Sequence, residues 1–122
     1  MGMKVLVVDD SRAIRQSIRF ILEQNGYEIL EGSDGVEGLE KLASARVDLI
    51  ITDVNMPNMD GITFIKKVRE KADLRFVPIL VLTTESQQSV MEEAKAAGAT
   101  GWIVKPFSTD KLLAAVRLRI GF

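Results

Sequence analysis

Residues 5–11 read VLVVDDS, which is four consecutive apolar residues followed by two carboxylates and a serine. A run that is apolar at every position is typical of a strand covered on both faces. The sequence contains five short β-rich apolar runs, several of them apolar at consecutive positions: Val5–Val8, Tyr27–Glu31, Leu49–Thr52, Ile79–Leu82 and Trp102–Val104. The first run therefore predicts a buried parallel strand, and the other four predict its companions.

Stretches of helical periodicity lie between these runs. The stretch Ser11–Asn25 carries one apolar stripe and closes on Gly26, Ser86–Ala97 closes on Gly98, and Ser108 is placed to cap a last helix. Five strand–helix repeats predict an α/β fold with an open, doubly wound parallel sheet, a flavodoxin-like (βα)5 architecture. The expected strand order is 2-1-3-4-5, which is taken from known sheets of this kind rather than worked out from the residues.

Composition limits the chemistry. The chain has 122 residues, which suits one domain over residues 1–122, and it contains no cysteine and no histidine. Disulfides, zinc sites and Ser-His-Asp triads are thereby excluded. A net charge of −1 argues against a nucleic-acid partner, and no apolar run is long enough to span a membrane. Because the first residues show no secretory pattern, we expect a cytoplasmic protein, and we expect it to be a monomer.

Polar side chains follow four of the predicted strands. Asp9 and Asp10 follow the first strand, Asp53 the third, Thr83 the fourth and Lys105 the fifth. In the expected order the first and third strands are neighbours, so the three carboxylates converge and the pKa of at least one must rise. A hard divalent cation such as Mg²⁺ would relieve that repulsion, and a lysine and a hydroxyl opposite it suit a phosphoryl group.

Four segments carry a family resemblance: VLVVDDS (5–11), DVNMPNMDG (53–61), LTTES (82–86) and GWIVKPF (101–107). In order and spacing they resemble the receiver domain of two-component response regulators, and the likeness covers essentially the whole chain. It is closest in kind to the stand-alone CheY-like members. The resemblance implies a signalling domain of a chemotaxis type that catalyses its own phosphotransfer rather than turnover of external substrates.

The resemblance also implies residue roles. Asp53 would accept a phosphoryl group from a sensor histidine kinase, and Mg²⁺ would be held by Asp10, Asp53 and the backbone carbonyl of Asn55, with Asp9 acting through water. Thr83 and Lys105 would bind the phosphoryl oxygens, and the Lys105–Pro106 bond would be cis. Asn55 and Glu85 would set the rate of dephosphorylation and favour a short-lived phosphorylated state, and a phosphatase is a possible further partner.

An apolar outer face is expected on the last two helices and the strand between them. With Val90, Ala94 and Ala97 turned to the core, Met91 is predicted to point outward; with Leu112, Val116 and Ile120 turned inward, an outer strip of Ala114, Ala115 and Leu118 remains. Trp102 lies between the two helices. In the family this face carries output, for example to a flagellar switch component, and Trp102 occupies the aromatic switch position.

Two interpretations stay open at this stage. Arg12, Arg15 and Arg19 on one flank of the first helix, with Phe20 opposite its apolar stripe, are either a solvated basic face or a docking surface for an acidic kinase or phosphatase. The rival function is a Mg²⁺-dependent aspartyl-phosphate phosphatase of haloacid-dehalogenase type. Those phosphatases carry a D-x-D pattern after the first strand, where this chain has Asp9-Asp10-Ser11. A flavodoxin-like cofactor binder is disfavoured because Asp9-Asp10 would repel a phosphate.

Overall fold

The computed structural model describes residues 2–84 and 88–121. Its strands are β1 (Lys4–Val8), β2 (Glu28–Gly32), β3 (Leu49–Asp53), β4 (Ile79–Thr83) and β5 (Gly101–Val104). Its helices are α1 (Arg12–Gln24), α2 (Gly35–Ser44), α3 (Gly61–Arg69), α4 (Gln88–Ala97) and α5 (Thr109–Ile120), with a short 3-10 turn, η1 (Ala72–Leu74). Strands and helices alternate along the chain as predicted.

All four strand pairings are parallel, and the order across the sheet is β2-β1-β3-β4-β5. The predicted flavodoxin-like (βα)5 fold and its strand order are confirmed. β1 and β3 are neighbours in register from Val5 opposite Leu49 to Val8 opposite Thr52. The residues that follow these two strands therefore emerge side by side at one edge of the sheet.

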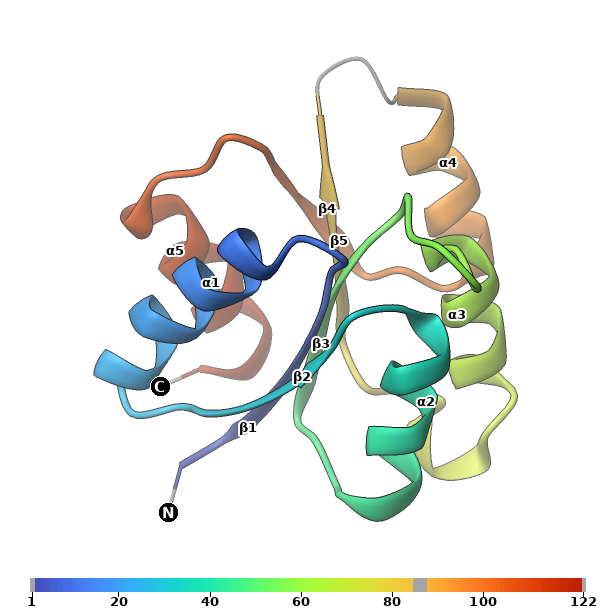
Figure 1. The fold of residues 1–122 in the computed structure, drawn as a ribbon, viewed down its shortest axis with the longest axis horizontal. Coiled ribbons are helices and arrows are strands. Elements are labelled where there is room, and N and C mark those ends of the chain that lie inside the picture. The colour runs from blue at the N-terminus through green and yellow to red at the C-terminus, as the bar shows by residue number, and fades with distance from the viewer. Residues whose placement is uncertain (1, 85–87, 122) are drawn as a thin grey trace.

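The sheet separates two apolar layers (Figure 1). α1 and α5 cover one face, where Ile18, Leu22 and Val116 pack against alternate residues of the strands. α2, α3 and α4 cover the other face, where Phe64 is the largest fully buried side chain. Because both faces are covered, β1 is apolar and buried from Val5 to Val8, as its sequence predicts.

The helix ends follow the local sequence. Ser11, Asp34, Asp60 and Ser108 each accept a backbone N–H three residues ahead and so cap α1, α2, α3 and α5. Gly26 and Gly98 take positive φ after α1 and α4, as their sequence positions predict. The predicted strand limits differ from the observed ones by one residue at most. Among the helices of the two described ranges, none combines the length and the apolar composition needed to cross a membrane.

Candidate functional site

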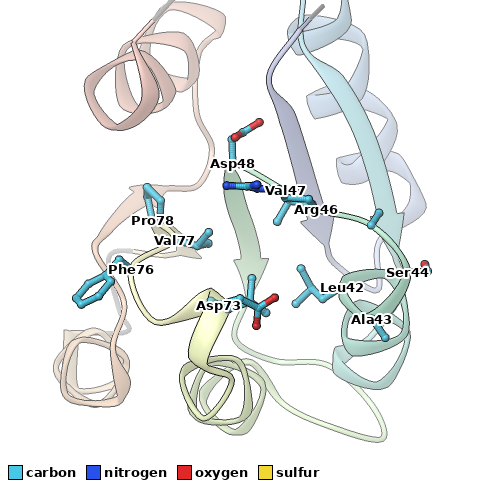
Figure 2. Close-up of a pocket in the computed structure, with 12 residues that line it drawn as sticks. Leu42, Ala43, Ser44, Arg46, Val47, Asp48, Asp73, Phe76, Val77 and Pro78 are labelled. Carbon is cyan, nitrogen blue, oxygen red and sulfur yellow. The ribbon is translucent and has the colours of Figure 1, made fainter.

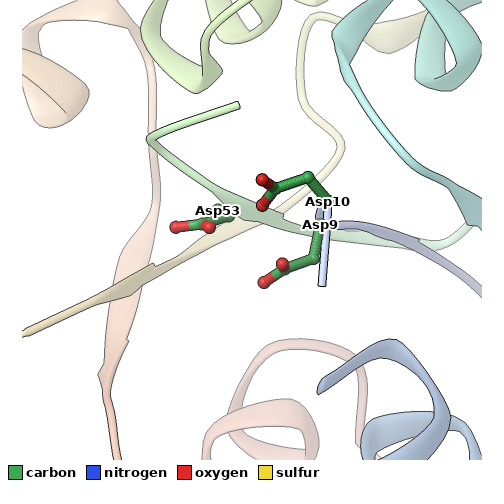
Figure 3. Close-up of side chains that lie close together, drawn as sticks. All are labelled: Asp9, Asp10 and Asp53. Carbon is green, nitrogen blue, oxygen red and sulfur yellow. The ribbon is translucent and has the colours of Figure 1, made fainter. Parts of the chain in front are cut away.

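Three carboxylates meet at the carboxyl edge of β1 and β3. Asp9 and Asp10 follow β1, and Asp53 is the last residue of β3. One oxygen from each lies within 4.8 Å of an oxygen of the others. Figure 3 shows the three carboxylates gathered beside these strand ends. Asp9 and Asp53 are buried and Asp10 is exposed, so the cluster opens to solvent on the Asp10 side.

The carboxyl group of Asp9 has a raised pKa. Burial raises the pKa of its carboxyl from 3.8 to about 6; the backbone N–H of Ser11 opposes that rise, and the charge of Asp53 adds to it. The N–H of Ser11 donates to Oδ1 at 2.8 Å, whereas Oδ2 is buried and has no hydrogen-bond partner among the described residues. A buried carboxylate oxygen without a protein partner is available to bind a metal ion or another group.

Asp53 is held by two neighbours through the same oxygen. The backbone N–H of Val54 donates to Oδ1 at 2.8 Å, and Nζ of Lys105 lies 3.5 Å from that atom. Oδ2 is the oxygen that neither contact occupies. With only 7% of its surface exposed, Asp53 has a carboxylate of fixed direction and one oxygen open to reaction.

Thr83 and Lys105 supply the other half of the site from β4 and the end of β5. The backbone N–H of Lys105 donates to the carbonyl of Thr83 at 2.6 Å, which ties the two strand ends together. The Thr83 side chain is fully buried, and its hydroxyl has no hydrogen-bond partner within residues 2–84 and 88–121. The Lys105–Pro106 bond is cis, as the resemblance implies.

The loop between β3 and α3 returns close to Asp53. A side chain on Gly61 would collide with the backbone carbonyl of Asp53, so the close approach needs a glycine; the N–H of Gly61 also donates to the carbonyl of Val54 at 2.8 Å. Asn55 lies in this loop, two residues after Asp53, and is exposed.

The donor set fits a hard divalent cation. It consists of oxygens alone, from three carboxylates within reach of one ion, and one of those oxygens is buried and unpartnered. Mg²⁺ favours such ligands and keeps several waters, which the exposed Asp10 side allows. Asp9, Asp10 and Asp53 are the described residues that would hold it.

The expected outer face is only partly apolar in the structure. Trp102 is 44% exposed and Leu118 is 76% exposed, in agreement with the sequence. Met91 is half-buried, and its predicted outward direction stays a prediction. Ala115 also packs against the core rather than lying on an outer strip, and Leu113, unassigned by the sequence pattern, is buried.

A hollow of about 800 Å³ joins this face to the site. It is lined by Thr84, by residues 102–106 including Trp102 and Lys105, and by Lys111 and Ala115. Lys105 lines this hollow, and its Nζ also lies 3.5 Å from Oδ1 of Asp53, so the hollow adjoins the carboxylate cluster.

The arginines of α1 are mostly engaged within the protein. Arg15 donates to Glu31 at 3.1 Å and to the backbone carbonyl of Asp9 at 2.5 Å, and Arg19 donates to Glu31 at 2.6 Å. Burial of Glu31 opposes ionisation, but these hydrogen bonds outweigh it and hold its pKa below the usual value. These contacts weaken the interpretation of the arginines as a docking surface. Of the three, only Arg12 makes no ion pair with another described residue.

A second hollow, of about 690 Å³, lies at the opposite edge of the sheet (Figure 2). It is lined by residues 42–48, before β3, and by Asp73, Leu74 and 76–78, before β4. Phe76, 90% exposed, stands at its side. Its lining holds none of the residues predicted to act in the site.

Two hydrogen bonds of the site and its adjoining loop were not predicted from the sequence. Arg15, which donates to the Asp9 carbonyl, was predicted only as part of a basic flank, and no motif singled out Asp34 and Asn58, whose side chains are hydrogen-bonded to each other. Glu85, predicted to tune dephosphorylation, lies outside the described residues.

Comparison with known proteins gives a consistent family. The family model of the response regulator receiver domain matches residues 5–117. The response regulator MprA of Mycobacterium ulcerans (strain Agy99) is 43% identical over 117 residues, which cover 96% of this chain and 50% of that protein. The chain thus spans about half the length of the curated relatives it matches.

Solved structures agree with the fold throughout the chain. The chemotaxis response regulator CheY4 of Vibrio cholerae is 48% identical, with a TM-score of 0.92 over 97% of this chain and 98% of that one. The receiver domain of the sensor histidine kinase PA1611 from Pseudomonas aeruginosa PAO1 is 28% identical, with a TM-score of 0.91 over 100% of both chains, and is described with a magnesium ion coordinated in its active-site cleft.

Proposed function

The chain belongs to the response regulator receiver domain family, and from that membership we propose that it accepts a phosphoryl group on Asp53 from a sensor histidine kinase. Receiver domains of two-component systems take their phosphoryl groups from such kinases. The observation that carries the assignment to Asp53 is its buried carboxylate, oriented by Val54 and Lys105 through one oxygen only.

Phosphoryl transfer requires mainly that the protein position the reacting groups and neutralise their charge. An oxygen of Asp53 attacks the phosphorus of the phosphohistidine, the phosphorus–nitrogen bond breaks, and an acyl phosphate remains on Asp53. The ammonium of Lys105 offsets the negative charge of the phosphoryl oxygens. The buried hydroxyl of Thr83 supplies a hydrogen bond that no described residue now receives.

Mg²⁺ is the proposed cofactor, held by Asp9, Asp10, Asp53 and the carbonyl of Asn55. When bound, it supplies positive charge that relieves the mutual repulsion of the carboxylates and neutralises the incoming phosphoryl group. Support for it comes from the oxygen-only cluster within 4.8 Å and from the unpartnered oxygen of Asp9.

Output is proposed to pass through Trp102 and Leu118, with a smaller share for the half-buried Met91. When the Thr83 hydroxyl binds the phosphoryl group, the space beside β5 changes, and this biases Trp102 between two orientations. The hollow that contains both Trp102 and Lys105 supports this route.

We further propose a chemotaxis-type pathway with a flagellar switch component as output. The identity of 48% to the chemotaxis response regulator CheY4 of Vibrio cholerae supports it. Stand-alone action, a cytoplasmic location, a monomeric state and a phosphatase partner remain predictions. A haloacid-dehalogenase-type phosphatase or a flavin binder is no longer favoured, because the receiver family model spans residues 5–117.

Acetyl phosphate with Mg²⁺ tests the acceptor. Intact-protein mass spectrometry should show one added phosphoryl group, and borohydride reduction followed by peptide mapping should mark residue 53. Asp53→Asn should abolish the adduct. Asp60→Asn, a nearby carboxylate that caps α3, is the matched control and should retain it. An adduct that persists in Asp53→Asn would refute the assignment.

A further inference from the structure

The loop between β3 and α3 is fastened to a different part of the molecule, the start of α2. Nδ2 of Asn58 donates to Oδ2 of Asp34 at 2.6 Å, across 24 residues of sequence. Oδ1 of the same carboxylate accepts the backbone N–H of Glu37 at 2.9 Å and thereby caps α2. Asp34 is buried, although it lies outside the carboxylate cluster.

Asn58 adopts a left-handed backbone conformation, which is uncommon outside glycine although asparagine takes it more readily than most residues. Its φ is 67°, and it is the only non-glycine with positive φ among the described residues. A conformation of this kind persists when surrounding contacts hold it. The side chain of Asn58 is exposed, so its hydrogen bond to Asp34, rather than burial, provides the restraint.

A second contact fastens the same loop to α2. A side chain on Gly35 would come within 2.8 Å of Cγ and Sδ of Met59, so the start of α2 lies directly against Met59. The N–H of Met59 also donates to the carbonyl of Pro57 at 2.6 Å, which tightens the turn. The loop is therefore held on its α2 side by residues 58 and 59, and Asn55 lies between these anchors and Asp53.

We propose that Asp34 and Asn58 form a clamp that positions the β3–α3 loop, and with it the Asn55 carbonyl, for binding of Mg²⁺. The inference rests on the proposed function, because that function makes Asn55 a ligand. Both are positioning residues, since they act through the loop and touch no bound group. One carboxylate thus does two things: Oδ1 caps a helix and Oδ2 holds the loop.

Three variants separate these roles. Asn58→Gly removes the amide at an exposed position and tolerates the positive φ, so it releases the loop at little cost to the fold. Asp34→Ser keeps a side-chain oxygen to cap Glu37 but cannot reach Asn58. Asp34→Asn retains the cap and can restore the clamp, because its amide can donate to the oxygen of a flipped Asn58 side chain.

The test is the Kd for Mg²⁺ alone, measured by ¹H–¹⁵N chemical-shift titration. If release leaves the loop in its ligating arrangement a tenth to a third of the time, Asn58→Gly and Asp34→Ser should each raise Kd by roughly 3–10-fold. The double variant should be no worse than either single one, because both break the same contact. Asp34→Asn should rescue binding to within about twofold of wild type.

Asn25→Gly is the matched control. Like Asn58, Asn25 uses its side-chain amide as a donor. Its acceptor is the backbone carbonyl of Ile21 at 2.8 Å, at the far end of α1. It should leave the Kd unchanged. Wild-type binding combined with an unchanged Kd in Asn58→Gly would overturn the clamp alone. Absence of Mg²⁺ binding by the wild type would overturn the proposed site and the clamp with it.

Discussion

Replacing Asp9 by asparagine should stabilise the metal-free protein, and only above acidic pH. Burial raises the pKa of the Asp9 carboxyl from 3.8 to about 6, so its ionised form is disfavoured in the folded state. Because one unit of pKa difference corresponds to ~1.4 kcal/mol, ionised Asp9 lowers the free energy of unfolding by about 1–3 kcal/mol at neutral pH. An asparagine keeps the oxygen that accepts the Ser11 N–H and removes the charge.

The sign of the pH dependence is fixed by which state binds the proton. Between about pH 4 and pH 6 the folded chain holds the Asp9 proton that the unfolded chain has released, so wild-type stability falls as the pH rises. The gain from Asp9→Asn should therefore be small near pH 4 and complete above about pH 7.

Urea unfolding at several pH values, in EDTA and in excess Mg²⁺, measures this. Asp10→Asn is the control: Asp10 is exposed, so its removal should give a smaller gain in EDTA. Wild type should gain stability from Mg²⁺ by mass action, Asp10→Asn should lose that gain, and Asp9→Asn should keep less of it than wild type. If wild type and Asp9→Asn differ by the same amount at every pH, the reasoning from burial is refuted.

Three further predictions concern the response of Trp102, the lifetime of the phosphorylated state and the packing at Gly61. Beryllofluoride with Mg²⁺ should change the emission of Trp102, the single tryptophan, and the change should vanish in Asp53→Asn and Thr83→Ala; an unaltered spectrum, with binding confirmed by fluorine NMR, would refute the coupling. Glu85→Leu should slow loss of the phosphoryl group by excluding water, as followed by phosphate-affinity electrophoresis; an equal or faster loss would count against it. Gly61→Ala should cost about 1–3 kcal/mol in urea unfolding because its methyl meets the Asp53 carbonyl, and an unshifted midpoint would contradict the close approach.

The convergence of the carboxylates could be predicted because it depends on few facts. Parallel strands end at one edge, and the strand order makes β1 and β3 neighbours, so residues directly after both strands must meet. No knowledge of side-chain packing is needed. For the same reason Lys105, at the end of β5, could be assigned to this edge from sequence.

Other contacts depend on packing that periodicity does not record. Ala115 packs against the core because of how α5 lies on the sheet, whereas helical spacing alone allowed it to lie on an outer strip. Arg15 donates to Glu31 on β2. Helical spacing within α1 does not reveal that contact, so the sequence suggested a free cation. Asp34 and Asn58 both lie in loops, where no repeating pattern signals which residues meet.

The site is assembled from segments that are distant in the chain, and this has a consequence for folding. Lys105 and Asp53 are 52 residues apart, and β4 lies between their strands in the sheet. A chain ordered only through β4 would present the acidic cluster without Lys105 and would lack the part of one apolar layer that α5 provides. Phosphoryl transfer to Asp53 would then be a late-acquired property, available once the last strand has docked. An incompletely folded molecule would stay silent in the pathway rather than send a false signal.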